Sequence, residues 1–336
     1  MESSQLSHTL TSVPLLSPPA FQLEPKATKH RPDFLFLIHS AVLNFENRQT
    51  LRTHARRYNV TVVFVLGQMG NGRGIPLTVE QESASFADLI VGSFTDCYAN
   101  LTLKHLFALK WAHVNFPTVE FVVKADDDIL INFREIFRVV DKKYPPSSDL
   151  FANRVGYKVI AGFVFTKMNV IRDPTSKSCA THEEYPGKVY PDFCSGWGYI
   201  TTMETIESIL REVAVIDRGF WIDDVFVTGM LRQRSGDVFL DPLNHKYGAV
   251  VTALRRWVSD SEPCSWNMLF SETDGIDLLK ASYVRLETAR EQNGSWPSCV
   301  ESETQKRRTA PTGKPHVSVI HLSAFGHTVE HGYKAQ

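Results

Sequence analysis

Three adjacent carboxylates, Asp126-Asp127-Asp128, follow a short apolar run at residues 121–123, from which Lys124-Ala125 separates them. Neighbouring carboxylates repel one another, and a bound cation would offset that repulsion. Because alternate side chains of an extended segment share a face, Asp126 and Asp128 can point the same way while Asp127 points elsewhere. Two carboxylates suit Mg²⁺ or Mn²⁺, which keep coordination positions open for a diphosphate. The triplet therefore predicts a divalent-metal site at a strand end, with a solvated acidic turn as the structural alternative.

A second acidic pair, Asp223-Asp224, stands between the apolar segments 220–222 and 225–227. Burial among such residues raises the pKa of a carboxyl group towards the range in which it can act as a general base. The structural alternative is a helix start, where aspartates interact favourably with the helix dipole.

Two glycines flank an aromatic residue in Gly196-Trp197-Gly198, within the segment 190–199. Glycine permits close backbone approach, and an aromatic face can stack on a sugar or a base. A tight turn that packs aromatic side chains into the core is the alternative interpretation.

These groups need a folded sheet to position them, and three segments have the pattern of its strands. They are the continuous apolar run Phe34–Ile38, the β-branched run Val60–Leu66, and Glu120–Lys124, which leads into the acidic triplet. Short apolar strands that alternate with helices favour an α/β fold with a largely parallel sheet. Ligands of such sheets bind beyond the carboxyl ends of the strands, where the triplet falls.

Residues 102–114 have the clearest helical pattern in the chain. Apolar residues repeat there at intervals of four, four and three, which places one stripe on one face: Leu103, Phe107, Trp111 and Val114. Thr102 is the expected N-cap, and Pro117 follows the end of the helix. Residues 44–57, which carry Arg48 and Arg52, are expected to form a polar helix or loop.

Composition excludes several classes of protein. The chain has 336 residues, with 36 Lys and Arg against 37 Asp and Glu, a formal charge of −1. This balance argues against a nucleic-acid-binding protein with a basic surface. A hydrophobic content of 43% excludes disorder along the whole length. We expect a flexible leader at residues 1–32, a catalytic core at 33–250 and a C-terminal extension at 251–336, which is polar and aperiodic from about 255 to 315 and therefore partly loop-like.

The cysteines and possible glycosylation sites point modestly to a secretory lumen. Five cysteines occur without a CxxC pair, so a zinc ribbon is not supported, and the odd number leaves at least one thiol unpaired within the chain. Three N-x-[ST] triplets begin at Asn59, Asn100 and Asn293. No segment has the roughly 20 consecutive apolar residues of a membrane span, and residues 1–32 lack the pattern of a signal peptide.

Eight landmarks, taken in order, resemble those of the inverting β-1,3-glycosyltransferases, the animal Golgi family of galactosyl- and N-acetylglucosaminyltransferases (glycosyltransferase family 31). They extend over about two thirds of the chain: Phe34–Ser40, Arg48…Arg52, Val63–Gly67, Glu82-Ser83 with Asp88–Ile90, Asp96…Tyr98…Asn100–Lys104 with Trp111, Lys124–Asp128, Tyr190-Pro191…Cys194–Gly196…Gly198-Tyr199, and Asp223–Val225.

The resemblance implies a GT-A fold, in which a Rossmann-like, mainly parallel sheet flanked by helices belongs to a single catalytic domain. It also implies a UDP-sugar donor, a glycan acceptor on glycoprotein or glycolipid, and a catalytic domain in the lumen of the Golgi apparatus. Membrane association is expected only through an N-terminal signal anchor, which this sequence does not contain.

The same resemblance assigns roles to individual residues. It implies Mn²⁺ at Asp126 and Asp128, with His321 as a further metal ligand, and it matches Asp224 to the general base. The residues expected to bind the donor are Arg48, Arg52, Lys124, Asp126 and Asp127. The residues expected to bind the acceptor are Gly196, Trp197, Tyr199 and Asp223.

The sequence thus predicts an inverting β-1,3-hexosyltransferase that moves galactose from UDP-galactose to a hydroxyl group of an acceptor glycan. UDP-N-acetylglucosamine is the alternative donor. A phosphohydrolase would instead use Asp126 or Asp128 as a nucleophile. An inactive homologue that serves as a chaperone or lectin would be expected to lose the acidic motifs, which this chain keeps.

Overall fold

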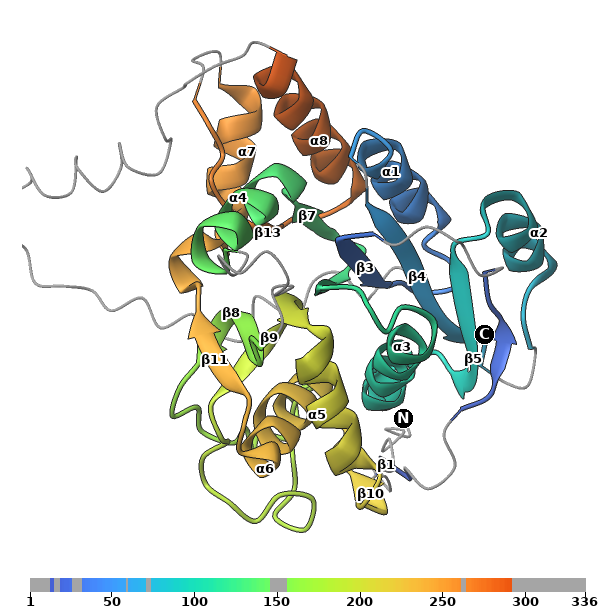
Figure 1. Cartoon of the computed structure of the whole chain (residues 1–336), viewed down its shortest axis with the longest axis vertical. Helices are drawn as coiled ribbons and strands as arrows, with labels where there is room; N and C mark the ends of the chain where they lie inside the picture. Colours follow the sequence, from blue (N-terminus) through green and yellow to red (C-terminus); the bar gives the residue numbers. More distant parts are fainter. Residues whose placement is uncertain are drawn as a thin grey trace, which may run out of the picture. The chain divides into compact units, whose positions relative to one another are not determined.

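The computed structural model describes residues 13–14, 19–25, 32–58, 60–70, 74–145, 156–260 and 264–291. These residues belong to two compact units, each described below by itself (Figure 1). The first, here called the sheet unit, takes its residues from 1–44, 55–127 and 144–244, and the second unit takes 45–54, 128–143 and the chain from 245 onward. The internal segments 45–54 and 128–143 thus belong to the same unit as the C-terminal part, so the two units are not separated by one cut in the sequence near residue 250.

The sheet unit contains an eight-stranded sheet in the order β11-β8-β9-β6-β3-β4-β5-β2. The strands are β2 (Phe21–Leu23), β3 (Phe34–His39), β4 (Thr61–Gln68), β5 (Leu89–Thr95), β6 (Phe121–Asp126), β8 (Val159–Phe165), β9 (Phe193–Thr202) and β11 (Phe239–Pro242). The neighbours β6, β3, β4 and β5 are parallel, and β11 is parallel to β8. Strand β9 is antiparallel to both β6 and β8, and β2 is antiparallel to β5. The predicted α/β fold with a mostly parallel sheet is confirmed.

All three strands predicted from apolar runs are present. Every residue of β3 is buried, as expected for a strand covered on both faces. Strand β4 continues one residue beyond Gly67, where its register with β5 shifts. A side chain at Gly67 would place its Cβ 2.7 Å from the carbonyl oxygen of Phe94, so only glycine fits this approach of the two strands.

Helix α3 (Leu101–Asn115) packs against β3, β4 and β5 of the sheet and against helix α5 (Met203–Val213) (Figure 1). The helix lies where the sequence pattern predicts it, but the predicted N-cap and the predicted buried face are wrong. Thr102 lies inside the first turn, after the short 3-10 turn η1 (Tyr98–Asn100), and Val114 of the predicted stripe is 64% exposed. Lys104 and His105 are buried instead, because both find polar partners inside the unit.

Other elements complete the sheet unit. Helix α2 (Leu77–Phe86) precedes β5, β10 (Arg218–Gly219) pairs with β1 (Val13–Pro14), and the π-helical segment η2 (Val225–Leu231) continues into α6 (Arg232–Ser235). The segment around Trp197 is not a tight turn but part of β9, a strand of ten residues. Within the described ranges Cys97, Cys179 and Cys194 are free thiols, whereas Cys264 of the second unit is disulfide-bonded.

The second unit combines a small sheet with four helices. Its elements are α1 (Phe45–Ala55), β7 (Ile129–Ile131), α4 (Phe133–Lys143), β12 (Tyr247–Gly248), α7 (Val251–Ser259), β13 (Phe270–Glu272) and α8 (Ile276–Glu291), and the 3-10 turn η3 (Asn244–Lys246) precedes β12. Strand β13 pairs with β7 in antiparallel and with β12 in parallel orientation.

The region from about residue 255, expected to be partly loop-like, contains the end of α7 and all of α8 in the part that the structure describes, with irregular segments between them. Both helices bury residues at helical spacing, Leu254 with Trp257 and Leu279 with Tyr283, among many charged neighbours that hide the pattern. Trp257 also packs against Trp266, with ring centroids 5.2 Å apart.

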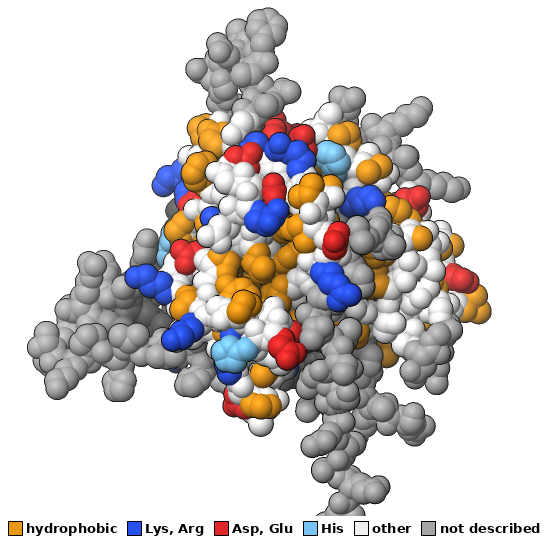
Figure 2. All heavy atoms as spheres, turned by 90° about the horizontal axis from the view of Figure 1, so that it is seen from below, with side chains coloured by type: hydrophobic (Ala, Val, Ile, Leu, Met, Phe, Trp, Pro, Cys, Tyr) orange, Lys and Arg blue, Asp and Glu red, His pale blue; other side chains and the backbone are white. Residues whose placement is uncertain are grey.

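Two surface observations bear on the excluded classes. In Figure 2, basic and acidic side chains are interspersed on the face shown, and neither sign forms a continuous patch there. Among the described helices, none combines the length and the apolar character that crossing a bilayer requires.

Candidate active site

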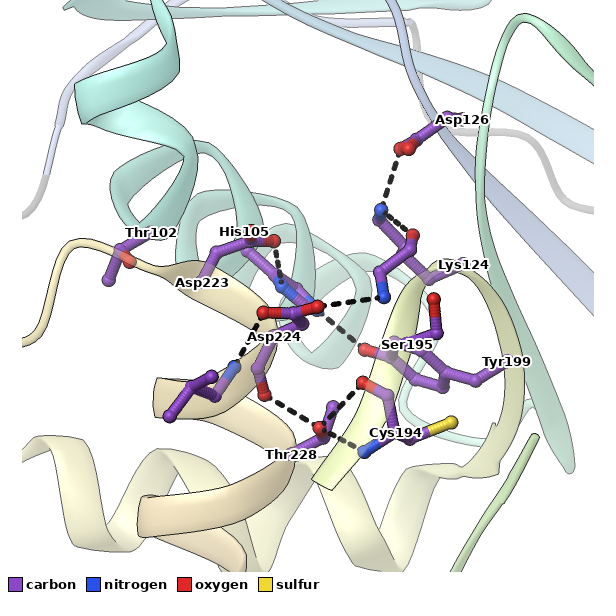
Figure 3. Close-up of polar contacts among 12 residues, drawn as sticks. Thr102, His105, Lys124, Asp126, Cys194, Ser195, Tyr199, Asp223, Asp224 and Thr228 are labelled. Carbon is purple, nitrogen blue, oxygen red and sulfur yellow. Dashed lines mark hydrogen bonds and ion pairs between the residues drawn. The ribbon is translucent and has the colours of Figure 1, made fainter. Parts of the chain in front are cut away.

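Asp224 directly precedes η2, and main-chain groups from two elements orient its carboxylate (Figure 3). The backbone N–H of Val225 donates to Oδ1 over 2.8 Å, and the backbone N–H of Gly196 in β9 donates to Oδ2 over 3.3 Å. A Cβ added to Gly196 would lie 3.6 Å from Cβ of Asp224, so the strand backbone passes directly beside the carboxylate. Asp224 is partly exposed, which leaves its carboxylate open to a ligand.

The electrostatic setting of Asp224 suits a proton acceptor. Burial, reinforced by the charge of the adjacent Asp223, raises its pKa to about 7. The two backbone N–H groups and Lys124 act in the opposite direction without cancelling this rise. A carboxylate with a pKa near neutrality can take a proton from a hydroxyl group and release it again.

Asp223 differs from its neighbour although both are aspartates in one turn. Its Oδ2 lies 2.9 Å from Nδ1 of His105, a residue of α3 that is fully buried. Burial alone would raise the pKa of Asp223, but the hydrogen bond from His105, together with the charge of Lys124, outweighs burial and holds the pKa below its usual value. Asp223 therefore stays ionised over the pH range in which Asp224 titrates.

The other nitrogen of His105, Nε2, lies 2.6 Å from the hydroxyl group of Tyr199 in β9 (Figure 3). Burial raises the pKa of Tyr199 well above its usual value, so the phenol keeps its proton and donates to Nε2. Burial lowers the pKa of His105, so the ring is neutral and its single proton sits on Nδ1, facing Asp223. The sequence led us to expect Tyr199 at the acceptor. In the structure Tyr199 is buried, and its hydroxyl group is hydrogen-bonded to His105.

Two threonines tie the acidic pair to the rest of the unit. The hydroxyl group of Thr102, one turn before His105 on α3, donates to the carbonyl of Phe220 over 2.8 Å. The hydroxyl group of Thr228 accepts from the backbone N–H of Cys194 over 2.8 Å and donates to the carbonyl of Asp224 over 2.6 Å. Helix α3 and strand β9 thus hold the segment on both sides of Asp223 and Asp224.

Asp126 ends β6 beside a buried cation. The ammonium group of Lys124 lies 2.7 Å from Oδ1 of Asp126 and also donates to the carbonyl of Gly196. The Lys124 side chain is 2% exposed, whereas that of Asp126 is 39% exposed. One oxygen of Asp126 is therefore paired inside the unit while the side chain still reaches solvent.

The remaining members of the triplet form the turn between β6 and β7. In the sheet unit, the carboxylate of Asp127 accepts from the hydroxyl group of Ser40 over 2.6 Å and from the amide of Asn44 over 3.2 Å. Asp127 is buried. In the second unit, Asp128 is partly exposed, and its carbonyl accepts from the hydroxyl group of Thr273 over 2.6 Å.

Carboxylate oxygens of Asp126 and Asp128 are the donor type that Mn²⁺ and Mg²⁺ prefer. No group of three or more His, Cys, Asp or Glu side chains converges within the described ranges. In the sheet unit, the side chain of Asp126 is 39% exposed and its Oδ1 is paired with Lys124, so Asp126 by itself fits an ion that keeps positions for a diphosphate and water. The further expected ligand, His321, lies outside the described residues.

The other expected site residues are located but not tested by the structure. Arg48 and Arg52 lie on α1 of the second unit and are buried, and Nη1 of Arg52 donates to Oε1 of Gln49 over 2.9 Å. Trp197 in β9 is half-buried beside Gly196.

Several residues of the site were missed in the sequence, above all His105, Thr102 and Thr228. The one available signal was the pair Lys104-His105 within an otherwise apolar stretch of helix, because a buried polar side chain needs a partner. Nothing in the sequence indicated which partner that would be.

Comparison with known proteins identifies the family. A family model described as Galactosyltransferase matches residues 46–237. Beta-1,3-galactosyltransferase 1 of Mus musculus is 31% identical over 229 residues, which cover 65% of this chain and 67% of that protein. Lactosylceramide 1,3-N-acetyl-beta-D-glucosaminyltransferase A of Xenopus laevis is 28% identical, over 66% of this chain and 55% of that protein. Acetylgalactosaminyl-O-glycosyl-glycoprotein beta-1,3-N-acetylglucosaminyltransferase of Homo sapiens is 29% identical, over 73% of this chain and 63% of that protein.

The matched region contains the acidic triplet, β9 and the Asp223–Asp224 pair, which include the candidate metal-binding and catalytic residues. The sheet that carries them is mostly parallel and flanked by helices, the GT-A arrangement expected from the sequence. The chain belongs to the Galactosyltransferase family and is a glycosyltransferase.

Proposed function

We propose that this protein transfers galactose from UDP-galactose to a hydroxyl group of an acceptor glycan, with inversion at the anomeric carbon and formation of a β-1,3 linkage. The observation that carries the proposal is Asp224, a partly exposed carboxylate that two backbone N–H groups orient and whose pKa is about 7. The similarity to a protein named beta-1,3-galactosyltransferase 1 supports the choice of reaction.

On the acceptor side, Asp224 takes the proton of the attacking hydroxyl group as that oxygen approaches the anomeric carbon. Attack from the face opposite to the departing UDP inverts the configuration. Gly196 and Trp197 are proposed to border the acceptor, because the backbone of Gly196 contacts Asp224 and the Trp197 side chain beside it is half-buried. A sugar ring can stack on such an aromatic face.

On the donor side, Asp126 and Asp128 are proposed to hold Mn²⁺ together with the diphosphate of the donor. When bound, the ion would offset the negative charge that develops on the β-phosphate of departing UDP. Lys124 positions Asp126 through the 2.7 Å ion pair between them. Donor contacts for Arg48, Arg52 and Asp127, and a metal contact for His321, stay predictions from the sequence.

The site of action is proposed from the family resemblance. We place the catalytic domain in the lumen of the Golgi apparatus, attached to the membrane, with glycoprotein or glycolipid glycans as acceptors. Two of the relatives are named for their acceptors, one for lactosylceramide and one for an acetylgalactosaminyl-O-glycosyl-glycoprotein, and these names support the two acceptor classes.

UDP-N-acetylglucosamine is the second candidate donor, because two of the three relatives described above are named as N-acetylglucosaminyltransferases. A donor screen separates the two. Purified protein with Mn²⁺ is incubated with UDP-galactose, UDP-N-acetylglucosamine or UDP-glucose, with and without galactoside or glucosaminide acceptors, and released UDP is measured.

Acceptor-dependent release of UDP from UDP-galactose, lost in Asp224→Asn, is the expected result. A preference for UDP-N-acetylglucosamine would replace the donor and leave the reaction class in place. Transfer with none of the donors, combined with hydrolysis of p-nitrophenyl phosphate, would favour the phosphohydrolase alternative, and absence of both activities would favour a chaperone or lectin.

A further inference from the structure

A buried chain of hydrogen bonds runs from β9 through α3 to the acidic pair. The Tyr199 hydroxyl group donates to Nε2 of His105 over 2.6 Å, and Nδ1 of His105 donates to Oδ2 of Asp223 over 2.9 Å. His105 and Tyr199 are both buried, and the proposed transfer reaction uses neither of them directly. Figure 3 shows the ring of His105 placed between the two partners.

This chain ends one residue before the proposed base. Asp223 and Asp224 are adjacent, and in such a pair each negative charge opposes ionisation of the other, so the protons leave in two coupled steps. Which carboxylate keeps the last proton depends on their separate surroundings. Asp223 has a buried N–H donor of a side chain, whereas Asp224 is held by backbone groups of Val225 and Gly196.

Other titratable groups also lie near Asp223 and Asp224. In the described structure, none of these groups forms a side-chain hydrogen bond with either carboxylate. They come from η1, β6 and β9, with one tyrosine before β9: Tyr98, Lys124, Asp126, Tyr190, Cys194 and Tyr199. His39 in β3 packs edge-on against His105, with ring centroids 5.3 Å apart. His105 is the group that contacts one member of the pair and not the other.

We propose that His105 is a positioning residue of the transfer reaction: its Nδ1–H group keeps one negative charge on Asp223 and thereby makes Asp224 the carboxylate that takes up the acceptor proton. The part of this statement that concerns the acceptor rests on the proposed function. The distribution of charge within the pair does not. The opposite directions of the pKa shifts of the two aspartates agree with the geometry.

Two substitutions at His105 separate its two hydrogen bonds. In His105→Asn, the amide nitrogen occupies about the place of Nδ1 and can still donate to Asp223. In His105→Gln, the amide reaches towards Tyr199 and the donor to Asp223 is lost. Asp223→Asn removes the charge itself. Thermal unfolding of each variant shows whether it is folded.

The measurement is a titration of the aspartate carboxyl carbons by ¹³C NMR on the metal-free protein, with the Asp224 signal assigned by its loss in Asp224→Asn. We expect a midpoint about 7 for Asp224 in the wild type. The midpoint should stay in place in His105→Asn. In His105→Gln the last proton of the pair should leave at higher pH, because Asp223 now competes for it. In Asp223→Asn the midpoint should fall by about one pH unit or more.

The opposite directions expected for His105→Gln and Asp223→Asn keep the proposal open to refutation. An unchanged midpoint in folded His105→Gln would overturn it, and so would equal shifts in His105→Gln and His105→Asn. If His105→Gln does not fold, the Asp223→Asn variant is sufficient by itself: an unchanged or higher titration midpoint of Asp224 in that variant would overturn the proposal.

A parallel measurement of kcat against pH, with Mn²⁺ and donor, distinguishes this proposal from the proposed function. The acid limb of the profile should move with the NMR midpoint in each variant. Suppose that the NMR midpoints move as expected while the acid limb of the kcat profile does not move, or while the wild type transfers no sugar. The proposed distribution of charge between Asp223 and Asp224 is then still supported. The role of Asp224 as the base, and with it that of His105 in transfer, then falls.

Discussion

The hydroxyl group of Ser40, which follows β3, donates to Oδ2 of Asp127 over 2.6 Å, and this bond gives Asp127 a different environment from that of Asp126. Asp127 also accepts from Asn44 and is 6% exposed, whereas the side chain of Asp126 is 39% exposed. Three adjacent residues of one type therefore do not have one function. The buried member joins two segments of the sheet unit, and a neighbour reaches solvent.

Asp127→Ala is expected to lower the free energy of unfolding by about 1–3 kcal/mol, because it leaves the buried Ser40 and the partly buried Asn44 without this acceptor. Chemical denaturation measures the loss. Binding of UDP with Mn²⁺, measured by calorimetry, should persist in the folded variant. Asp126→Asn is the comparison: it should lose binding, and it should also lower stability, because it leaves the buried ammonium group of Lys124 without the charge that pairs with it. Loss of binding in Asp127→Ala at full stability would instead support the donor contact expected from the sequence.

The rate of transfer should depend on pH through Asp224. A base acts in its ionised form, so activity should be full above its pKa of about 7 and should fall about tenfold per pH unit below it. A plot of log kcat against pH from 5 to 9 tests this. Asp224→Asn should lose nearly all transfer at every pH while still binding UDP with Mn²⁺. A flat profile through pH 7 would remove Asp224 from the mechanism.

The proposed base should also lower the stability of the fold. A carboxyl group whose pKa is raised on folding binds its proton more tightly in the folded state. The contribution of Asp224 to stability is therefore most favourable below about pH 4 and is lost as pH rises through the folded pKa of about 7. Asp224→Asn should therefore unfold at higher denaturant concentration than the wild type at pH 8, by on the order of 1 kcal/mol after allowance for solvent screening. The difference should vanish at pH 4. A variant less stable than the wild type at pH 8 would contradict this expectation.

Thr228 offers a test of the link between β9 and η2. Thr228→Val keeps the shape but removes the group that bonds the N–H of Cys194 and the carbonyl of Asp224. We expect a loss of about 1–3 kcal/mol in the free energy of unfolding and a lower kcat, because the turn that holds Asp224 loosens. Thr228→Ser keeps the hydroxyl group and should restore most of both. A larger effect of Thr228→Ser than of Thr228→Val would show that the methyl group, not the hydroxyl group, matters.

The sequence was informative where local pattern decides the structure. The apolar run of β3 and the apolar strand that leads to Asp126 could be recognised because a strand buried on both faces needs continuous hydrophobic residues. The raised pKa expected for the second acidic pair occurs at Asp224 and not at Asp223. That difference depends on His105, which lies 118 residues away in the chain, and no local pattern encodes such a contact.

The same limit explains the errors about α3 and why no helix was recognised around residue 255. Thr102 resembles an N-cap, but its hydroxyl group serves a carbonyl 118 residues further along the chain. In α7, basic residues at positions 255 and 256 separate the buried Leu254 and Trp257, so the segment looks polar although one face is buried. Partners that are distant in the chain, rather than propensity, decide both cases.

Both hydrogen bonds that orient Asp224 come from the peptide backbone, at Gly196 and Val225. Side-chain replacement cannot delete a peptide N–H group, except replacement by proline, so these two supports withstand most mutations. Neighbouring side chains are then free to diverge without displacing the proposed base. A site supported in this way can acquire new acceptors over evolutionary time while its chemistry is inherited unchanged.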